Sequence, residues 1–164
     1  YAPRLDGDAD YWRAIGILHD FDWEIHSDLD SHPMEGAKIL RERGVDEETI
    51  RTILSHYEQG TGVKPEKAVD YALLACDDIT GLITAVTLVR PSRDICDVKL
   101  RSVRKKWKDK RFAGGVDRDH VQDAVDDFSE NCFDGQLDLW QHISNVLQAM
   151  QEEAATLGLD GKGD

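Results

Sequence analysis

Residues 16–40, GILHDFDWEIHSDLDSHPMEGAKIL, join an apolar run to an adjacent imidazole and carboxylate, His19 and Asp20. The apolar residues before this pair recur at helical spacing, and Asp8 can cap the helix that they predict. A polar loop follows, and Pro33 suits the first turn of a second helix. The stretch therefore predicts two helices, with a histidine–aspartate pair at the end of the first.

The rest of the chain continues in helical patterns, without a strand of convincing alternation. Asp46 and Asp97 can each cap a further helix. The longest pattern, residues 66–89, is apolar on most faces and is expected to be the central helix. Two more helices are predicted over about residues 118–129 and 136–157, followed by a frayed tail. These patterns predict an all-α fold, a helical bundle with additional C-terminal helices.

The composition limits the classes of function. The formal net charge of −13 argues against a general affinity for nucleic acid or anionic membranes. From the sequence, we expect no apolar stretch to be long enough to cross a bilayer. The three cysteines, an odd number without a CxxC motif, are typical of reduced core thiols in a cytosolic protein. We therefore expect a cytoplasmic protein.

Four polar features lie where a helical core or its edge should be apolar. They are the pair His19–Asp20, His32, His56 and the pair Asp77–Asp78. Neighbouring helical residues point about 100° apart, so only one of the last two carboxylates can face a given site. A carboxylate within an apolar helix is costly unless it is paired, hydrogen-bonded or bound to a cation. Imidazole and carboxylate ligands suit Zn, Mn and Fe, so a shared metal site and separately solvated side chains both remain open.

Four segments, in this order and spacing, resemble the HD-domain superfamily of metal-dependent phosphohydrolases. They are residues 16–24 (GILHDFDWE), 32–40 (HPMEGAKIL), 52–58 (TILSHYE) and 71–92 (YALLACDDITGLITAVTLVRPS). More narrowly, the chain is similar to small stand-alone bacterial HD proteins, in which the central helix is followed by a basic helix and a short helical ending. Residues 101–119 (RSVRKKWKDKRFAGGVDRD) fit that continuation. The resemblance implies one HD-type domain, with a metal-site core over residues 1–113 and C-terminal helices over 114–164 packing on it.

The resemblance also implies roles for the candidate residues. It makes His19, Asp20 and Asp77 the ligands of a first divalent ion, with Asp78 as the less favoured register. His32 and His56 would bind a second ion, bridged to the first by Asp20. Fe, Mn, Ni or Zn is expected rather than Mg, as one or two ions.

The implied reaction is hydrolysis of a phosphate ester or nucleotide by metal-activated water, with His19 and Asp20 as catalytic residues. The family has a further upstream histidine that the segment before His19 lacks, and we expect the helix that carries it to precede this chain. The sequence HDFDWE replaces the HDIGK of better-known relatives, so we do not assign their cyclic-dinucleotide or polynucleotide substrates to this chain. The expected partner is a small phosphorylated substrate, with neither nucleic acid nor membrane. The alternative is a catalytically silent metal- or nucleotide-binding module.

A basic helix stands out in this acidic chain. Residues 99–111 hold eight basic residues of thirteen. The residues Arg101, Arg104, Lys105 and Lys108 share one face of that helix. Three interpretations stay open: a solvated amphipathic helix, a phosphate-attracting rim and a nucleic-acid patch.

Overall fold

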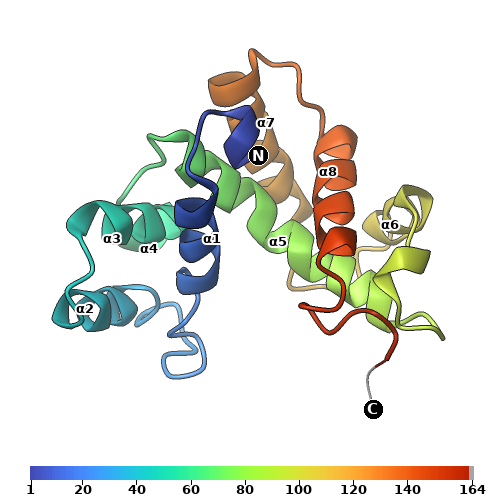
Figure 1. Ribbon diagram of the computed structural model, residues 1–164, viewed down its shortest axis with the longest axis horizontal. Helices are drawn as coiled ribbons and strands as arrows, with labels where there is room; N and C mark the ends of the chain where they lie inside the picture. The colour runs from blue at the N-terminus through green and yellow to red at the C-terminus, as the bar shows by residue number, and fades with distance from the viewer. Residues whose placement is uncertain (163–164) are drawn as a thin grey trace. The chain divides into compact units, whose positions relative to one another are not determined.

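The computed structural model describes residues 1–162. Its α-helices are α1 (Ala9–Leu18), α2 (Met34–Glu42), α3 (Glu47–Leu54), α4 (Glu58–Thr61), α5 (Ala68–Leu88), α6 (Leu100–Trp107), α7 (Arg118–Phe133) and α8 (Leu139–Glu152). Single 3-10 turns form η1 (Ala2–Arg4), η2 (Ser55–Tyr57) and η3 (Ile95–Asp97). Within residues 1–162 the only β-type pairing is an isolated bridge between Asp94 and Asp160. The predicted all-α class is therefore confirmed (Figure 1).

The chain divides into two compact units, Tyr1–Leu74 and the residues from Ala75 on. Helix α5, drawn in green in Figure 1, begins in the first unit and continues into the second. This division falls at residue 74 rather than 113. The expectation of one domain with a boundary at residue 113 stays a prediction.

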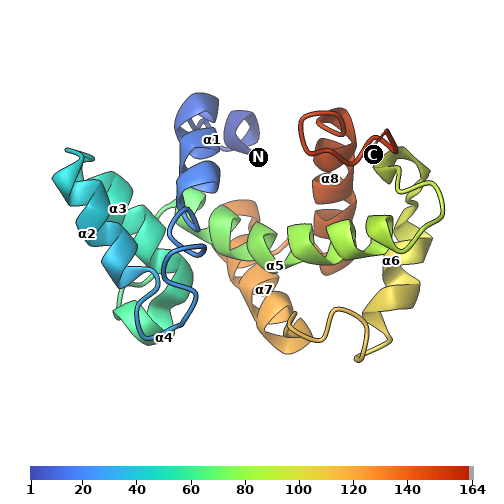
Figure 2. The same cartoon turned by 90° about the horizontal axis from the view of Figure 1, so that it is seen from below.

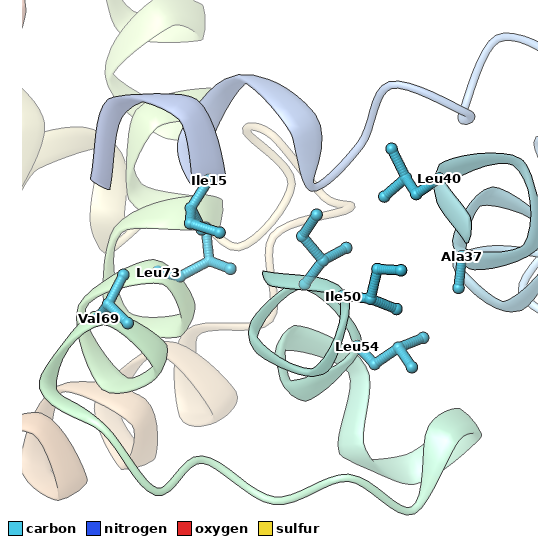
Figure 3. Packing of buried hydrophobic residues seen from close by; sticks show 8 residues of the cluster. Ile15, Ala37, Leu40, Ile50, Leu54, Val69 and Leu73 are labelled. Carbon is cyan, nitrogen blue, oxygen red and sulfur yellow. The ribbon is translucent and has the colours of Figure 1, made fainter. Parts of the chain in front are cut away.

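The first unit is built around an aliphatic core from α1, α2, α3 and the beginning of α5. Figure 3 shows these side chains facing one another, and the buried members are Ile15, Ala37, Leu40, Ile50, Ile53, Leu54, Val69 and Leu73. The predicted caps form as expected. Asp8 accepts hydrogen bonds from the first turn of α1, and Asp46 accepts one from the backbone N–H of Thr49 in α3. Capping satisfies N–H groups that a helix leaves unpaired, so these aspartates define where α1 and α3 begin.

A buried ion pair joins α3 to the beginning of α5 within the first unit. The Arg51 guanidinium donates to Oδ2 of the fully buried Asp70 at 2.5 Å. The same oxygen accepts hydrogen bonds from the backbone N–H groups of Glu66 and Lys67, at 2.9 and 3.0 Å. Asp70 therefore fixes the first turn of α5 against α3, which brings Leu73 into the core.

The second unit contains the continuation of α5 together with α6, α7 and α8, whose ribbons Figure 2 shows from below. Each of these helices buries apolar side chains. Asp117 and Asp138 cap α7 and α8 through their side chains. His142 of α8 is fully buried, and its Nε2 lies 2.9 Å from the carbonyl oxygen of Ala75. This histidine therefore has the packing role that its position outside any ligand spacing predicts.

Two local predictions for the second unit are wrong. Asp97 does not cap α6, because it is the last residue of η3, and Lys99 occupies the N-cap position of α6. The side chain of Asp94 caps η3. The tail is not frayed up to residue 162, since the buried Leu159 accepts a hydrogen bond from the Ile95 N–H at 2.8 Å. Residues 163–164 of the predicted tail lie outside the described residues.

The cysteines differ from the prediction in their burial. Cys76, Cys96 and Cys132 are all free thiols, as expected. Cys96 is exposed and the other two are only partly buried, so the expected core location is wrong. The reason for Cys96 is its place in the short η3 turn, where only Ile95 is buried.

Helix α5 contradicts the expectation that no segment is long and apolar enough to cross a membrane. By length and composition alone, its 21 residues could cross a bilayer, contrary to the expectation that no stretch is long enough. A core helix of a soluble protein passes the same test, and 44% of the apolar window of α5 is buried. The single helix of this kind within residues 1–162 is therefore weak evidence for a membrane span.

The burial of His142 predicts acid sensitivity of the second unit. Burial lowers the pKa of His142 from 6.5 to about 4, because the charged imidazolium is poorly solvated there. The unfolded chain therefore binds this proton first, and stability is lost as the pH falls from about 6.5 to about 4. We expect His142→Gln to remove about 3 kcal/mol of this pH dependence in urea unfolding followed by circular dichroism.

His120→Gln is the matched control, since His120 lies near the beginning of α7 and is partly exposed. It should leave the pH dependence of the wild type intact. Equal pH dependence in the wild type and in His142→Gln would contradict the prediction.

Candidate metal centre

His32 is held in one orientation by a buried carboxylate. Its ring is almost fully buried, and Nδ1 lies 2.8 Å from Oδ1 of Asp22, which has no exposed surface. Oδ2 of Asp22 accepts a hydrogen bond from the backbone N–H of Gly36 at 3.1 Å. A carboxylate only accepts hydrogen bonds, so Nδ1 of His32 carries the proton and its Nε2 presents a lone pair.

His56 presents the same nitrogen from the other side of the site. It lies in η2, directly after α3, and its Nδ1 donates to the carbonyl oxygen of Ile53 at 2.5 Å. Its Nε2 is 3.1 Å from Nε2 of His32. Because both Nδ1 atoms donate elsewhere, two electron-rich Nε2 atoms face each other across this short distance.

Asp20 adds a carboxylate to the two imidazoles. Its Oδ1 is 3.2 Å from Nε2 of His32 and 3.5 Å from Nε2 of His56. Candidate ligand atoms of these three residues all lie within 4.8 Å of one another. When the imidazoles are protonated, a hydrogen bond from His56 and the positive charges of the nearby histidines lower the pKa of the Asp20 carboxyl, against the opposing effect of burial. Such a set of electron-rich atoms needs a cation among them, so it fits a divalent ion.

His19 approaches the other oxygen of Asp20. It follows the last residue of α1, and its Nδ1 lies 2.9 Å from the carbonyl oxygen of Gly16. Its Nε2 is 3.5 Å from Oδ2 of Asp20. All three histidines therefore direct Nδ1 to a protein acceptor and Nε2 toward Asp20. The structure thus brings together four of the five predicted ligands, His19, Asp20, His32 and His56.

Asp77 belongs to the second compact unit, and its role as a ligand stays a prediction. It follows Leu73 by four residues in α5, so the two side chains share a helical face, and Leu73 lies in the core of the first unit. Asp77 and Asp78 are both partly buried, which makes them less costly than the fully buried carboxylate that the sequence indicates. Burial and the charge of Asp77 raise the pKa of Asp78, so the Asp78 carboxyl ionises less readily than an ordinary aspartate.

Sequence reasoning missed the role of Asp22. It marked Asp22 only as a departure from the HDIGK form, and nothing in the spacing separates it from the other acids of the same loop. One usable signal was Gly36 inside a helical pattern, since such a glycine often marks a close approach of another group. A Cβ atom at Gly36 would lie 2.5 Å from Oδ2 of Asp22, so no larger residue fits there without displacing the carboxylate.

Comparison with known protein families gives one match. Residues 1–79 match the family model described as HD domain. No curated protein and no solved structure matches the chain. The matched range includes His19, Asp20, His32, His56 and Asp77. The narrower similarity to small stand-alone bacterial proteins stays a prediction.

Replacing Asp22 by asparagine tests its hold on His32. An amide offers one acceptor oxygen, whereas His32 and Gly36 each donate to a separate oxygen of Asp22, so one of the two bonds must be lost. We expect Asp22→Asn to weaken Zn²⁺ or Co²⁺ binding by about 10–100-fold in calorimetric titration of chelator-treated protein.

Asp30→Asn makes the same chemical change at an exposed position of the same loop. It should leave the affinity within about twofold of wild type, below the effect of a lost ligand-orienting bond. Equal affinities of all three proteins would show that Asp22 does not orient a ligand.

Proposed function

The chain belongs, through residues 1–79, to the HD-domain superfamily, and on this premise we propose that it is a metal-dependent phosphohydrolase. We place its activity on a phosphate ester or nucleotide. The observation that carries the proposal is the convergence of Asp20, His32 and His56, whose Oδ1 and Nε2 atoms lie 3.1–3.5 Å apart. Hydrolysis of phosphate compounds is the chemistry general to this superfamily.

The proposed ligand sets divide around Asp20. His32 and His56 approach its Oδ1, whereas His19 approaches its Oδ2. A carboxylate with partners on both oxygens is suited to bridging two cations. We propose that His32, His56 and Asp20 would hold one ion, and that His19, Asp20 and Asp77 would hold the other. The imidazole-rich set favours Fe, Mn, Ni or Zn over Mg.

The proposed reaction needs an activated water, an ionised Asp20 and correctly oriented imidazoles. A bound divalent ion would lower the pKa of water and neutralise charge that develops on phosphoryl oxygens. Asp20 remains a carboxylate at neutral pH, since its pKa lies below the ordinary value. Asp22 and the carbonyl oxygens of Gly16 and Ile53 keep the three imidazoles in the tautomer that leaves Nε2 directed toward the centre.

The loop between α1 and α2 carries exposed apolar side chains that favour a small substrate with a flat or apolar part. Trp23 lies against His32, with ring centroids 4.9 Å apart and planes at 89°. Trp23 remains 42% exposed, and Ile25 and Leu29 of the same loop are more exposed still. An exposed indole beside a phosphate-hydrolysing centre can stack on a nucleobase, so we favour a nucleotide among the phosphate esters.

Turnover by reloaded protein tests the proposed activity. We expect chelator-treated protein to regain phosphate release from nucleotides when Mn²⁺, Fe²⁺, Ni²⁺ or Zn²⁺ is added. His56→Gln should lose at least about 100-fold in kcat/KM, because it removes one imidazole ligand, with helical content unchanged by circular dichroism. The measurement is release of inorganic phosphate from a panel of nucleotides and sugar phosphates.

Metal binding without turnover on any of these compounds would overturn the enzymatic proposal. It would leave the alternative, a metal- or nucleotide-binding module without catalysis.

The two neighbouring aspartates of α5 provide a matched test of the second ligand set. We expect Asp77→Asn to lower the number of bound ions per chain by about one, and Asp78→Asn to leave it unchanged, since only one of the two faces a given site. Metal content of the purified variants by elemental analysis gives the answer. An equal loss in both variants, or a loss only in Asp78→Asn, would show that the assigned register is wrong.

A further inference from the structure

The second unit contains a pocket of about 510 Å³ that the proposed metal centre does not use. It lies between the end of α5 and helix α6, and all its lining residues fall between Val86 and Asp109. Pockets of this volume are within the range that small ligands occupy in proteins. The volume of this pocket therefore suits a small ligand.

The lining of this pocket is positively charged. Arg90, Lys105 and Lys106 face one acid, Asp109, in a chain whose net charge is −13. Asp109 lies within 4 Å of a different cation, exposed Arg111, at 3.9 Å. No carboxylate of residues 1–162 forms an ion pair with the three pocket cations, although Lys106 Nζ also lies 4.2 Å from the centroid of the Phe112 ring. Three cations beside one acid leave the lining with a net positive charge, which favours an added anion.

Arg90 supplies the second, independent observation. Its Nε is buried, and no acceptor for it exists among residues 1–162. A buried donor without an acceptor is costly, and a guanidinium donates most favourably to carboxylate or phosphate oxygens. The dipoles of the helix ends account for cations near the last turns of α5 and α6, but they do not supply an acceptor for this N–H.

We propose that Arg90, Ser102, Lys105 and Lys106 form a binding pocket for the phosphate group of a small phosphorylated ligand. The guanidinium and the two ammonium groups would balance phosphate charge, and the Ser102 hydroxyl can donate a further hydrogen bond. Val86 and Val89 give the same pocket an apolar wall for the rest of the ligand.

A small ligand fits this surface better than a nucleic-acid strand does. Strand binding needs a groove along several phosphates and exposed aromatic rings for base stacking. Trp107, the one tryptophan of α6, is partly buried and packs against Trp140 with ring centroids 5.8 Å apart. The charge is instead gathered in one pocket, which favours a single phosphate or diphosphate group.

Titration of the chelator-treated full chain with inorganic pyrophosphate tests this site. We expect a Kd below about 1 mM at low salt by calorimetry. Lys105→Gln should weaken binding at least about fivefold, because it removes a cation from the pocket. Arg90→Lys keeps the charge but loses the planar fork, and it should weaken binding to a similar degree.

Arg101→Gln is the matched control, since it removes one charge from an exposed position of α6 outside the pocket. It should weaken binding clearly less than Lys105→Gln does, because the Arg101 side chain is exposed to solvent and does not line the pocket. His56→Gln, which alters the proposed metal centre, should also bind pyrophosphate normally. The Lys105 side chain is exposed, so Lys105→Gln should keep the circular dichroism spectrum of the wild type. An unchanged spectrum would show that its weaker binding is not caused by unfolding.

Two results would overturn the proposal. One is the absence of pyrophosphate binding up to about 10 mM, or equal weakening in Arg101→Gln and Lys105→Gln. The other is tight binding of single-stranded RNA with a steep salt dependence that pyrophosphate does not compete away, which would assign the basic helix to nucleic acid. Neither result bears on the phosphohydrolase proposal, because the titration uses no metal and no turnover.

Discussion

The centre of the first unit depends on one buried carboxylate. Asp22 accepts the Nδ1 proton of His32 and the backbone N–H of Gly36, and it has no exposed surface. This pair of bonds fixes the tautomer of His32 and turns its Nε2 toward that of His56. Without it, His32 could rotate or exchange its proton, and the convergence of ligand atoms around Asp20 would be lost.

The fold supplies each ligand from a position where a helix ends or a loop is held. His19 follows the last residue of α1, and His56 follows α3 in a single 3-10 turn. Their Nδ1 atoms bond to carbonyl oxygens of the preceding turn, which helix ends leave without an intrahelical partner. The helix ends thus satisfy their own unpaired carbonyl groups and orient the proposed metal ligands with the same bonds.

The sequence predicted most of this arrangement, and its failures have physical causes. The caps at Asp8 and Asp46 follow from local spacing, which helical periodicity makes readable. The proposed ligand roles of His19, His32 and His56 come instead from the resemblance to the HD-domain superfamily. Asp22 could not be found, because its partners lie ten and fourteen residues away and depend on how the loop folds back. The buried Leu159 was missed for the same reason, since its hydrogen-bond partner Ile95 is distant in the sequence.

The basic helix shows where periodicity alone misleads. One face of α6 carries Arg101, Arg104, Lys105 and Lys108, and that pattern reads as a continuous charged surface. The structure divides this face. Arg104 lies over the Trp140 ring at 4.7 Å, whereas Lys105 lines a pocket with Lys106 and with Arg90 from beyond α5. A uniform solvated stripe would need no contribution from another segment. The Arg90 side chain, whose Nε is buried without an acceptor among residues 1–162, comes from a different part of the sequence, and its addition is what favours an anion pocket over a solvated surface.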